Sequence, residues 1–179
     1  RDSFHTGPRA AAHGGITCFL DFTVGHPDLS LPEALERRLE EAKPSCIDYS
    51  FRTEMIGWTP ERAGEIVEVA ELGVRSFKFY TAYSESGRRT PLGHLRAAME
   101  AIRGIGGVAM VHCEADELVD PSGGPFPAAR PAIAEEVAIA EVGILARETG
   151  CPTYIAHISS TRGLAAYLEA PGAGDVGDV

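Results

Sequence analysis

A chain of 179 residues is long enough to form one domain with a substantial buried core. Its 16 basic and 26 acidic side chains give a formal net charge of −10, which argues against a nucleic-acid-binding surface. The hydrophobic content of 44% is ordinary for a soluble globular protein, and neither a membrane-spanning run nor a signal peptide is visible. We therefore expect a cytoplasmic protein with no nucleic-acid or membrane partner.

The predicted elements alternate between strands and helices along the chain. Ser30, Pro32 and Glu33 form a capping-box pattern that predicts the start of one helix. Strands are expected at residues 16–22, 46–51, 73–83, 108–114 and 153–160. Helices are expected at residues 3–13, 31–43, from 59 onwards, 91–105, 132–149 and 161–168.

Five strands that alternate with helices predict a parallel α/β sheet with right-handed crossovers. We expect a single domain over residues 1–179, with a Gly-, Ala- and Asp-rich segment at 170–179 that frays. The long connection at residues 115–130 follows a strand, so we expect it to surround an active site.

The four cysteines lie far apart and form no CxxC pair, which excludes a zinc finger. Their positions in or beside strands predict buried, reduced thiols, as in a cytosolic protein. Cys113 directly follows His112, so strand alternation predicts that it points to the opposite face and has a structural role.

Lys78 stands in the middle of a strand between Phe77 and Phe79. Burying an ammonium group without a partner costs several kcal/mol. One solution is a lysine at the strand mouth whose head reaches solvent. The other is an uncharged amine that takes up carbon dioxide and becomes a carbamate, an anion that can bridge two metal ions.

Two later strand segments each carry a histidine at or near their C-terminal end, His112 and His157. In a barrel of parallel strands, residues from the C-terminal ends of different strands meet at the catalytic face. A lysine and two histidines at equivalent heights are typical of a metal site. A satisfied core histidine is the alternative for each position, but its recurrence at two strand ends favours the metal site.

These segments closely resemble the hydantoinase/dihydropyrimidinase branch of the cyclic amidohydrolases. The resemblance begins near Asp2 and covers nearly the whole chain. The segments that carry it are Ser76-Phe77-Lys78-Phe79, Ala82-Tyr83, Val111-His112-Cys113-Glu114, Arg130-Pro131 and Tyr154-Ile155-Ala156-His157-Ile158-Ser159-Ser160.

The resemblance implies a partial (β/α)8 TIM barrel, since five strands do not close one. In relatives, a His-x-His pair lies upstream of this region and an aspartate lies downstream. No two histidines stand two apart in this chain. We therefore expect the central part of a longer enzyme, inactive by itself, that is a homotetramer when full length.

The resemblance also implies a site. Lys78 would be N-carboxylated and would bridge two divalent metal ions, usually zinc, with His112 and His157 completing the shell of one. Tyr83 would be catalytic and would bind substrate, by donating its hydroxyl to the substrate carbonyl and the developing oxyanion. Tyr80 and the loop at residues 81–90 would line the substrate pocket. For Glu114 and Asp116, a role in orienting a ligand and a solvated loop position are both open, and we favour the solvated position.

The expected function is hydrolysis of a cyclic amide, such as a hydantoin, a dihydropyrimidine or a related imide, by a metal-bound hydroxide. An allantoinase or a dihydroorotase on the same scaffold is the alternative, and the Arg88-Arg89 pair could bind the carboxylate of a dihydroorotate. A non-catalytic dihydropyrimidinase-like assembly protein is the other alternative. Retention of Lys78, His112 and His157 argues against it.

Overall fold

The computed structural model describes residues 2–120 and 122–170, which form one sheet of five parallel strands in sequential order. The strands are β1 (Cys18–Phe22), β2 (Asp48–Glu54), β3 (Ser76–Tyr80), β4 (Val108–His112) and β5 (Thr153–Ile155). Each strand pairs in parallel with the next one in the chain. This arrangement confirms the predicted fold class, because sequential parallel strands joined by helices form part of a (β/α)8 barrel.

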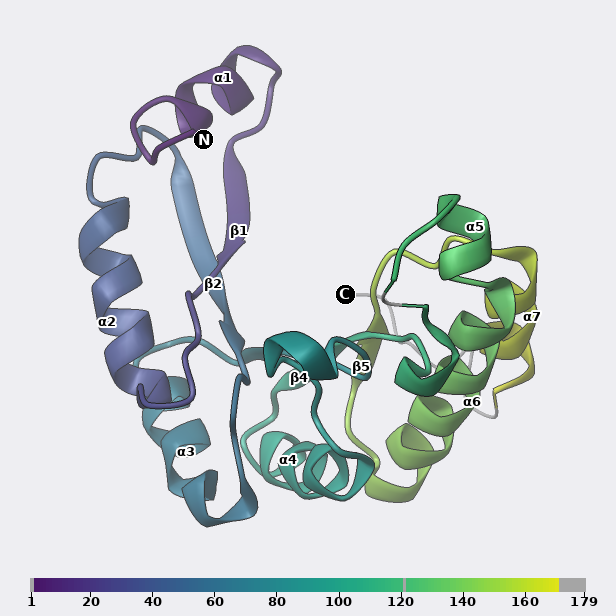
Figure 1. Ribbon diagram of the computed structural model, residues 1–179. Coiled ribbons are helices and arrows are strands. Elements are labelled where there is room, and N and C mark those ends of the chain that lie inside the picture. The colour runs from purple at the N-terminus through teal and green to yellow at the C-terminus, as the bar shows by residue number, and fades with distance from the viewer. Residues whose placement is uncertain (1, 121, 171–179) are drawn as a thin grey trace.

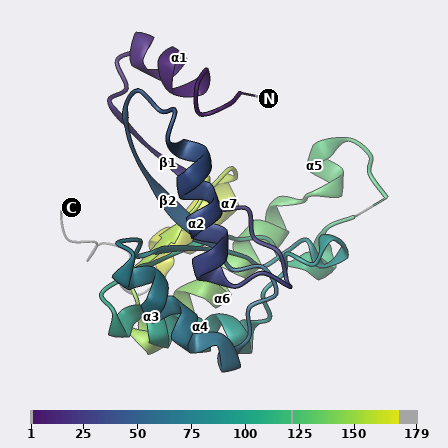
Figure 2. The same cartoon turned by 90° about the vertical axis from the view of Figure 1, so that its left-hand side faces the viewer.

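Helices lie between consecutive strands of the chain, before the first strand and after the last one (Figure 1). They are α1 (Gly7–His13), α2 (Leu31–Ala42), α3 (Ala63–Glu71), α4 (Leu92–Gly104), α5 (Phe126–Ala129), α6 (Ala132–Thr149) and α7 (Thr161–Glu169), with 3-10 turns η1 (Pro60–Arg62), η2 (Ser84–Ser86) and η3 (Asp116–Leu118). Figure 2 shows α1 and β1, together with the paired start of β2, extending away from the rest of the molecule. We call α1 and β1, residues 7–22, the N-terminal extension.

The core lies between the sheet and helices α2, α3, α4 and α6. Phe77, Phe79 and Val111 contribute fully buried side chains from the strands. Because side chains alternate along a strand, Lys78 points to the opposite face of β3 from Phe77 and Phe79. The packing of the aromatic residues therefore determines on which face the lysine lies.

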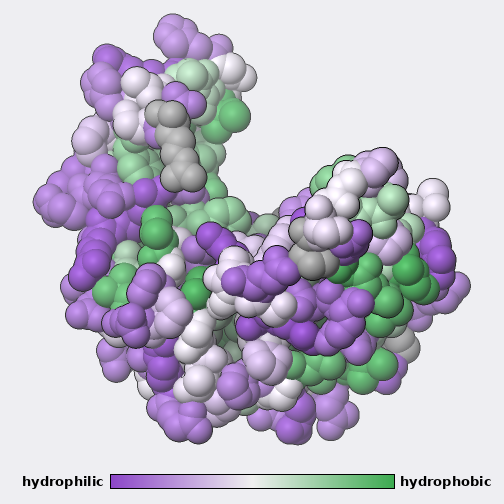
Figure 3. All heavy atoms as spheres, viewed as in Figure 1, coloured by the Kyte–Doolittle hydropathy of each residue, from purple (hydrophilic) through white to green (hydrophobic). Residues whose placement is uncertain are grey.

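The face of the molecule in Figure 3 is mostly hydrophilic, with scattered apolar patches. The exposed large apolar side chains of α6 and α7 are Ile144, Leu164 and Leu168. Figure 3 also shows a hollow between the N-terminal extension and the part of the molecule that contains α5. Within residues 2–120 and 122–170, no helix has both the length and the apolar character needed to cross a bilayer.

The capping box at α2 is confirmed. The Ser30 hydroxyl accepts a hydrogen bond from the Glu33 amide, and the Glu33 carboxylate accepts one from the Ser30 amide. The boundaries of other elements differ from the predicted ones. The first helix begins only at Gly7, and β2 continues to Glu54. Of the predicted frayed segment 170–179, residues 171–179 lie outside the described residues.

The last strand is shorter than predicted. β5 ends at Ile155, so His157 lies two residues beyond it in a left-handed backbone conformation with φ of 40°. The prediction of four buried thiols is wrong for two cysteines. All four are free, but Cys18 and Cys46 are exposed, whereas Cys113 and Cys151 are buried. Cys18 is exposed because it lies on β1, the last strand at one side of the described sheet.

Candidate active site

The lysine and the two histidines lie on three neighbouring strands, on the C-terminal side of the sheet. Lys78 is in the middle of β3, His112 is the last residue of β4, and His157 follows β5. The register pairs Tyr80 with His112, so Lys78 lies one pleat deeper than the histidine. The strands therefore place the three predicted ligands on one side of the sheet.

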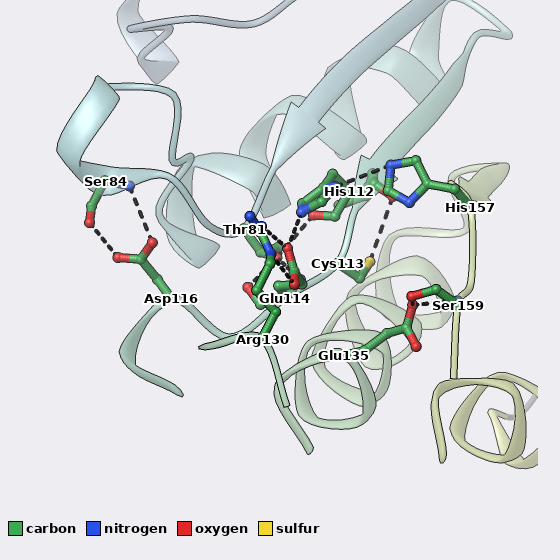
Figure 4. Close-up of polar contacts among 11 residues, drawn as sticks. Thr81, Ser84, His112, Cys113, Glu114, Asp116, Arg130, Glu135, His157 and Ser159 are labelled. Carbon is green, nitrogen blue, oxygen red and sulfur yellow. Dashed lines mark hydrogen bonds and ion pairs between the residues drawn. The ribbon is translucent and has the colours of Figure 1, made fainter. Parts of the chain in front are cut away.

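The two imidazoles face each other (Figure 4). Nδ1 of His112 lies 3.1 Å from Nε2 of His157, and the ring centroids are 4.8 Å apart. Two nitrogens bound to the same tetrahedral zinc ion, each at about 2.1 Å from it, would lie about 3.4 Å apart. The pair therefore fits a shared metal ion as well as a direct hydrogen bond. Burial, and then electrostatic interaction with His112 and Lys78, lower the pKa of His157.

Lys78 is buried without a partner. The residue is 3% exposed, and its Nζ has no hydrogen-bond partner among the residues that the structure describes. The nitrogen lies 4.6 Å from the centre of the Tyr80 ring. Burial lowers the pKa of Lys78 to about 8, although the charge of Glu54 acts in the opposite direction. Buried polar atoms almost always have partners, so a buried amine without one is exceptional and needs an explanation.

Glu114 orients His112. Its carboxylate accepts a hydrogen bond of 2.5 Å from Nε2 of His112 and two from the Arg130 guanidinium, one of them at 2.8 Å. Burial alone would raise the pKa of Glu114, but the hydrogen bonds from Arg130 and His112 lower it to about 2. An ionised carboxylate on one ring nitrogen makes the other a better metal ligand and fixes the direction of the ring.

The prediction that Glu114 is a solvated loop carboxylate is therefore wrong. The partner that holds it, Arg130, lies 16 residues later in the chain. Asp116 is likewise not simply solvated, because it accepts hydrogen bonds from the amide and hydroxyl of Ser84 and pairs with Arg89. The Arg130-Pro131 motif carried the family resemblance, but nothing in its spacing indicated the contact with Glu114.

Tyr83 packs against His112 in a strained conformation. Its φ is 72°, and its ring centroid lies 4.9 Å from that of His112. The Arg130 guanidinium lies 4.8 Å from the centre of the same ring. A left-handed conformation costs of order 1–3 kcal/mol for a residue other than glycine and is common at functional sites. The amide and hydroxyl of Ser84 donate hydrogen bonds to Asp116, and these bonds hold the turn directly after Tyr83.

Tyr80 has a different environment from the one predicted for a substrate-binding residue. Its hydroxyl donates a 2.7 Å hydrogen bond to Glu54, which also pairs with Arg88 at 3.2 Å. Burial and the Glu54 carboxylate raise the pKa of Tyr80. The ring lies 6.0 Å from those of both Tyr83 and His112. Tyr80 thus borders the site through its ring, while its hydroxyl is bound to Glu54.

An open cavity of about 630 Å³ lies in front of the histidines. The predicted connection at residues 115–130 contributes to its wall. Cys113 also lines it, although alternation predicted that it would point away from His112; β4 ends at His112, so the alternation does not extend further. Burial raises the pKa of Cys113, so its thiol is protonated. The lining residues are Tyr83, His112, Cys113, Glu114, Phe126, Pro127, Arg130, Pro131, Ala132, Glu135, His157, Ser159 and Ser160.

Within residues 2–120 and 122–170, no three His, Cys, Asp or Glu side chains are grouped so that they could hold a metal ion. The unmodified donor set is therefore the pair of imidazoles. A carbamate on Lys78 would add oxygen ligands, and two imidazoles with a carboxylate-like oxygen are a suitable donor set for zinc. The orphaned Nζ of Lys78 and the spacing of the imidazoles fit such a centre.

Comparison with known proteins shows which proteins the chain is similar to. No protein-family model matches the chain. A dihydropyrimidinase from Rattus norvegicus is 31% identical over 89% of this chain and 33% of its own length. An allantoinase from Solibacter usitatus is 34% identical over 92% of this chain and 39% of its own length. The solved structure of a D-hydantoinase superposes with a TM-score of 0.87 and 26% identity, over 97% of this chain and 40% of the other.

The chain is a homologue of the dihydropyrimidinases, hydantoinases and allantoinases. It spans about a third to two fifths of the length of the dihydropyrimidinase and the allantoinase described above. The superposition confirms that its five strands correspond to part of a hydantoinase barrel.

Proposed function

We propose that this chain forms part of the active site of a metal-dependent cyclic amidohydrolase, which opens the ring amide of a hydantoin, dihydropyrimidine or related imide. The observation that carries the proposal is the buried, unpartnered Nζ of Lys78 on the same face of the sheet as His112, whose imidazole contacts that of His157. A structural lysine at a strand mouth would reach solvent or an acidic partner. Relatives named dihydropyrimidinase, D-hydantoinase and allantoinase support the same chemistry.

Lys78 would act as a carbamate. Because its pKa is lowered to about 8, more of its amine is uncharged near neutral pH than in an exposed lysine. The neutral nitrogen attacks the carbon of carbon dioxide, a new N–C bond forms, and one N–H proton passes to solvent. His112 and His157 would hold one metal ion together with this carbamate, and Glu114 would keep the His112 ring in place. Two divalent ions, zinc for this donor set, would supply an activated water and polarise the scissile carbonyl.

Tyr83 would stabilise the charge that develops on the substrate. A neutral phenol donates a hydrogen bond to the carbonyl oxygen and more strongly to the oxyanion that replaces it. Its ring lies between His112 and Arg130. The strained turn that follows it is held by the hydrogen bond that the Ser84 amide donates to Asp116. Tyr83 would therefore be both catalytic and substrate-binding, whereas Tyr80 would contribute only its ring to the substrate side.

The ion pairs of the two loop arginines favour an uncharged ring over a dihydroorotate. Arg88 pairs with Glu54, and Arg89 pairs with Asp116 and Glu117. Neither guanidinium is without a carboxylate partner, so neither is ready to receive the carboxylate of a substrate. This supports hydantoins, dihydropyrimidines and allantoin, which carry no carboxylate. The retained Lys78 and histidines support an enzyme over a non-catalytic assembly protein.

Two further properties belong to the proposal. The four free cysteines support a reducing compartment, which is the cytoplasm for this class of enzyme. A homotetramer remains a prediction of the resemblance for the longer protein. Size-exclusion chromatography with light scattering on the longer protein would test it.

The direct test compares the two lysines of this chain, Lys43 and Lys78. In a full-length protein grown with ¹³C-bicarbonate, Lys78→Ala should remove a carbamate signal that Lys43→Ala leaves in place. The same change should abolish both binding of the second metal ion and ring opening of hydantoin and dihydrouracil. A short-chain carboxylate should partly restore them, because it supplies the two bridging oxygens. Lys43→Ala, at an exposed residue paired with Glu40, is the control.

The mechanism is ruled out if Lys78→Ala leaves the metal stoichiometry and the turnover unchanged. The 179-residue chain by itself is expected to have no hydantoin-hydrolysing activity and no tight two-metal centre, because it offers only Lys78 and two histidines of the predicted ligand set. Zinc analysis and a ring-opening assay on residues 1–179 would test this. Two bound zinc ions with turnover within about 1–1000 per second would contradict it.

A further inference from the structure

Glu135 is a buried carboxylate close to the candidate site. It lies in the first turn of α6, is 8% exposed, and lines the cavity in front of the histidines. Among residues 2–120 and 122–170, no Lys, Arg or His side chain forms an ion pair with it. An isolated buried carboxylate costs several kcal/mol unless its oxygens are hydrogen-bonded. The hydrogen bonds that the Glu135 carboxylate accepts therefore offset the cost of burying it.

Among the described residues, the donors to the Glu135 carboxylate are two consecutive serines. Oε1 accepts from the amide of Ser159 at 2.7 Å and from its hydroxyl at 3.0 Å. Oε2 accepts from the amide of Ser160 at 2.8 Å and from its hydroxyl. Figure 4 shows Glu135 reaching from α6 to Ser159, on the segment that continues from His157. One side chain of α6 thus binds the turn between β5 and α7.

That turn carries His157. The backbone at His157 is left-handed, and the turn ends at Ser160, the N-cap of α7. Ser160 already caps α7 by accepting a hydrogen bond of 2.9 Å from the amide of Gly163. Capping of α7 needs Ser160 alone, so it does not explain the two hydrogen bonds from Ser159. These bonds hold the residue two positions after the histidine.

Gly163 shows how closely the turn and the carboxylate are packed. A Cβ built on Gly163 would overlap Oε2 of Glu135. Only glycine lets the first turn of α7 approach the carboxylate this closely. The N-terminal ends of α6 and α7 both lie beside Glu135, and their positive ends favour a negative charge there. Hydrogen bonds and these two helix ends therefore stabilise the carboxylate.

We propose that Glu135 is a positioning residue for His157: by collecting the N–H and O–H groups of Ser159 and Ser160, it holds the left-handed turn that aims the His157 imidazole at His112. This rests on the proposed function, in which His157 is a metal ligand. In this role Glu135 acts on His157 through the turn and is not itself a metal ligand. It does for His157, through the backbone, what Glu114 does for His112 through a direct hydrogen bond.

The experiment compares Glu135→Gln with Glu136→Gln. Both changes remove one negative charge from neighbouring positions of α6, but Glu136 pairs with Arg162 at the surface. In Glu135→Gln, the amide nitrogen cannot accept a hydrogen bond, so one of the two serines loses its acceptor. Gly163→Ala is a second variant, which displaces the carboxylate without changing its charge. Ser159→Ala is a milder third variant.

The first readout needs no metal. Amide hydrogen exchange at Ser159 and Ser160, and NMR contacts between the His112 and His157 rings, report the turn directly. Glu135→Gln and Gly163→Ala should speed exchange at these amides and weaken the ring contacts, whereas Glu136→Gln should leave both unchanged. Unfolding in urea, measured alongside, separates a local change from general destabilisation.

The second readout is zinc affinity in the full-length protein. Loss of an outer hydrogen-bond partner typically weakens metal binding by about 10- to 100-fold, and we expect this range for Glu135→Gln. The inference is overturned if Glu135→Gln lowers stability but leaves both the turn and the zinc affinity as in the wild type. If the wild type binds no zinc, the proposed function fails. The exchange data then decide the inference alone: a loosened turn supports it and an unchanged turn overturns it.

Discussion

Strands β1 and β3 have similar compositions and very different surroundings. Both mix aromatic residues with one charged side chain, Asp21 in β1 and Lys78 in β3. No residue of β1 is buried, whereas three consecutive residues of β3 are buried. Asp21 accepts a 2.6 Å hydrogen bond from Arg38, but the Nζ of Lys78 has no partner among the described residues. The comparison shows that the ionisable group of the exposed strand, Asp21, has a hydrogen-bonding neighbour, whereas the one on the covered strand, Lys78, has none among the described residues.

The largest expected difference between the two strands is in packing. Phe77→Ala removes a fully buried ring and should lower the free energy of unfolding by about 3–5 kcal/mol. Phe19→Ala, in β1, should cost only about 1 kcal/mol, because its ring is partly exposed and packs mainly against Phe4 and Tyr49. Urea unfolding of both variants measures the difference. Equal losses would mean that β1 is covered in solution.

The cysteines extend the comparison to the two halves of the sheet. Cys18 and Cys46 are exposed, whereas Cys151 is buried and burial raises its pKa to about 11. At pH 8 its thiolate fraction should be on the order of 100-fold below that of a free cysteine, so alkylation should be correspondingly slow. Mass spectrometry after timed iodoacetamide labelling gives the rate at each site. Fast labelling of Cys151 would show that the β4–β5 half opens as readily as the N-terminal extension.

Arg38 ties the exposed strand to α2. It donates to the carbonyl of Phe22 at 3.1 Å, pairs with Asp21 and lies over the ring of Phe4. Arg38→Ala should cost about 1–2 kcal/mol and speed hydrogen exchange in β1 more than in β3. Arg37→Ala, at an exposed residue of the same helix, is the matched control. If both variants change β1 exchange equally, Arg38 is not the anchor.

The smallest expected effect is a pH dependence where α2 meets α3. Burial would raise the pKa of Glu65, but hydrogen bonds from Arg62 and the Leu31 amide lower it overall. A carboxyl whose folded-state pKa is depressed contributes stability above its unfolded pKa, and the contribution is lost as pH falls through the folded pKa. Glu65→Gln should therefore remove about 1 kcal/mol or less near neutral pH and flatten the fall in stability below about pH 4.5.

Urea unfolding at a series of pH values tests this prediction. Glu68→Gln, at an exposed position of α3, serves as the control. If Glu65→Gln and Glu68→Gln give the same stability profile between neutral and acid pH, Glu65 does not hold α2 to α3.

Features that depend on residues close together in the chain could be predicted from the sequence. The range predicted for the long helix at residues 132–149 is the observed range of α6, and the capping box at Ser30 begins α2 as predicted. The order of strands and helices and the strand-end position of His112 were also predictable. Helix caps and side-chain periodicity involve residues within about four positions, so local sequence is enough to determine them.

Contacts between distant residues were decided only by the tertiary structure. Glu114 binds an arginine 16 residues away, and Glu135 binds serines 24 and 25 residues away. The end of β5 before His157 and the left-handed turns at Tyr83 and His157 also depend on such contacts. A charged residue in a sequence can be solvated, paired or buried, and the choice depends on which distant groups the packed chain brings to it. The sequence thus determined which residues can carry the chemistry, and packing decided which side chains hold them in place.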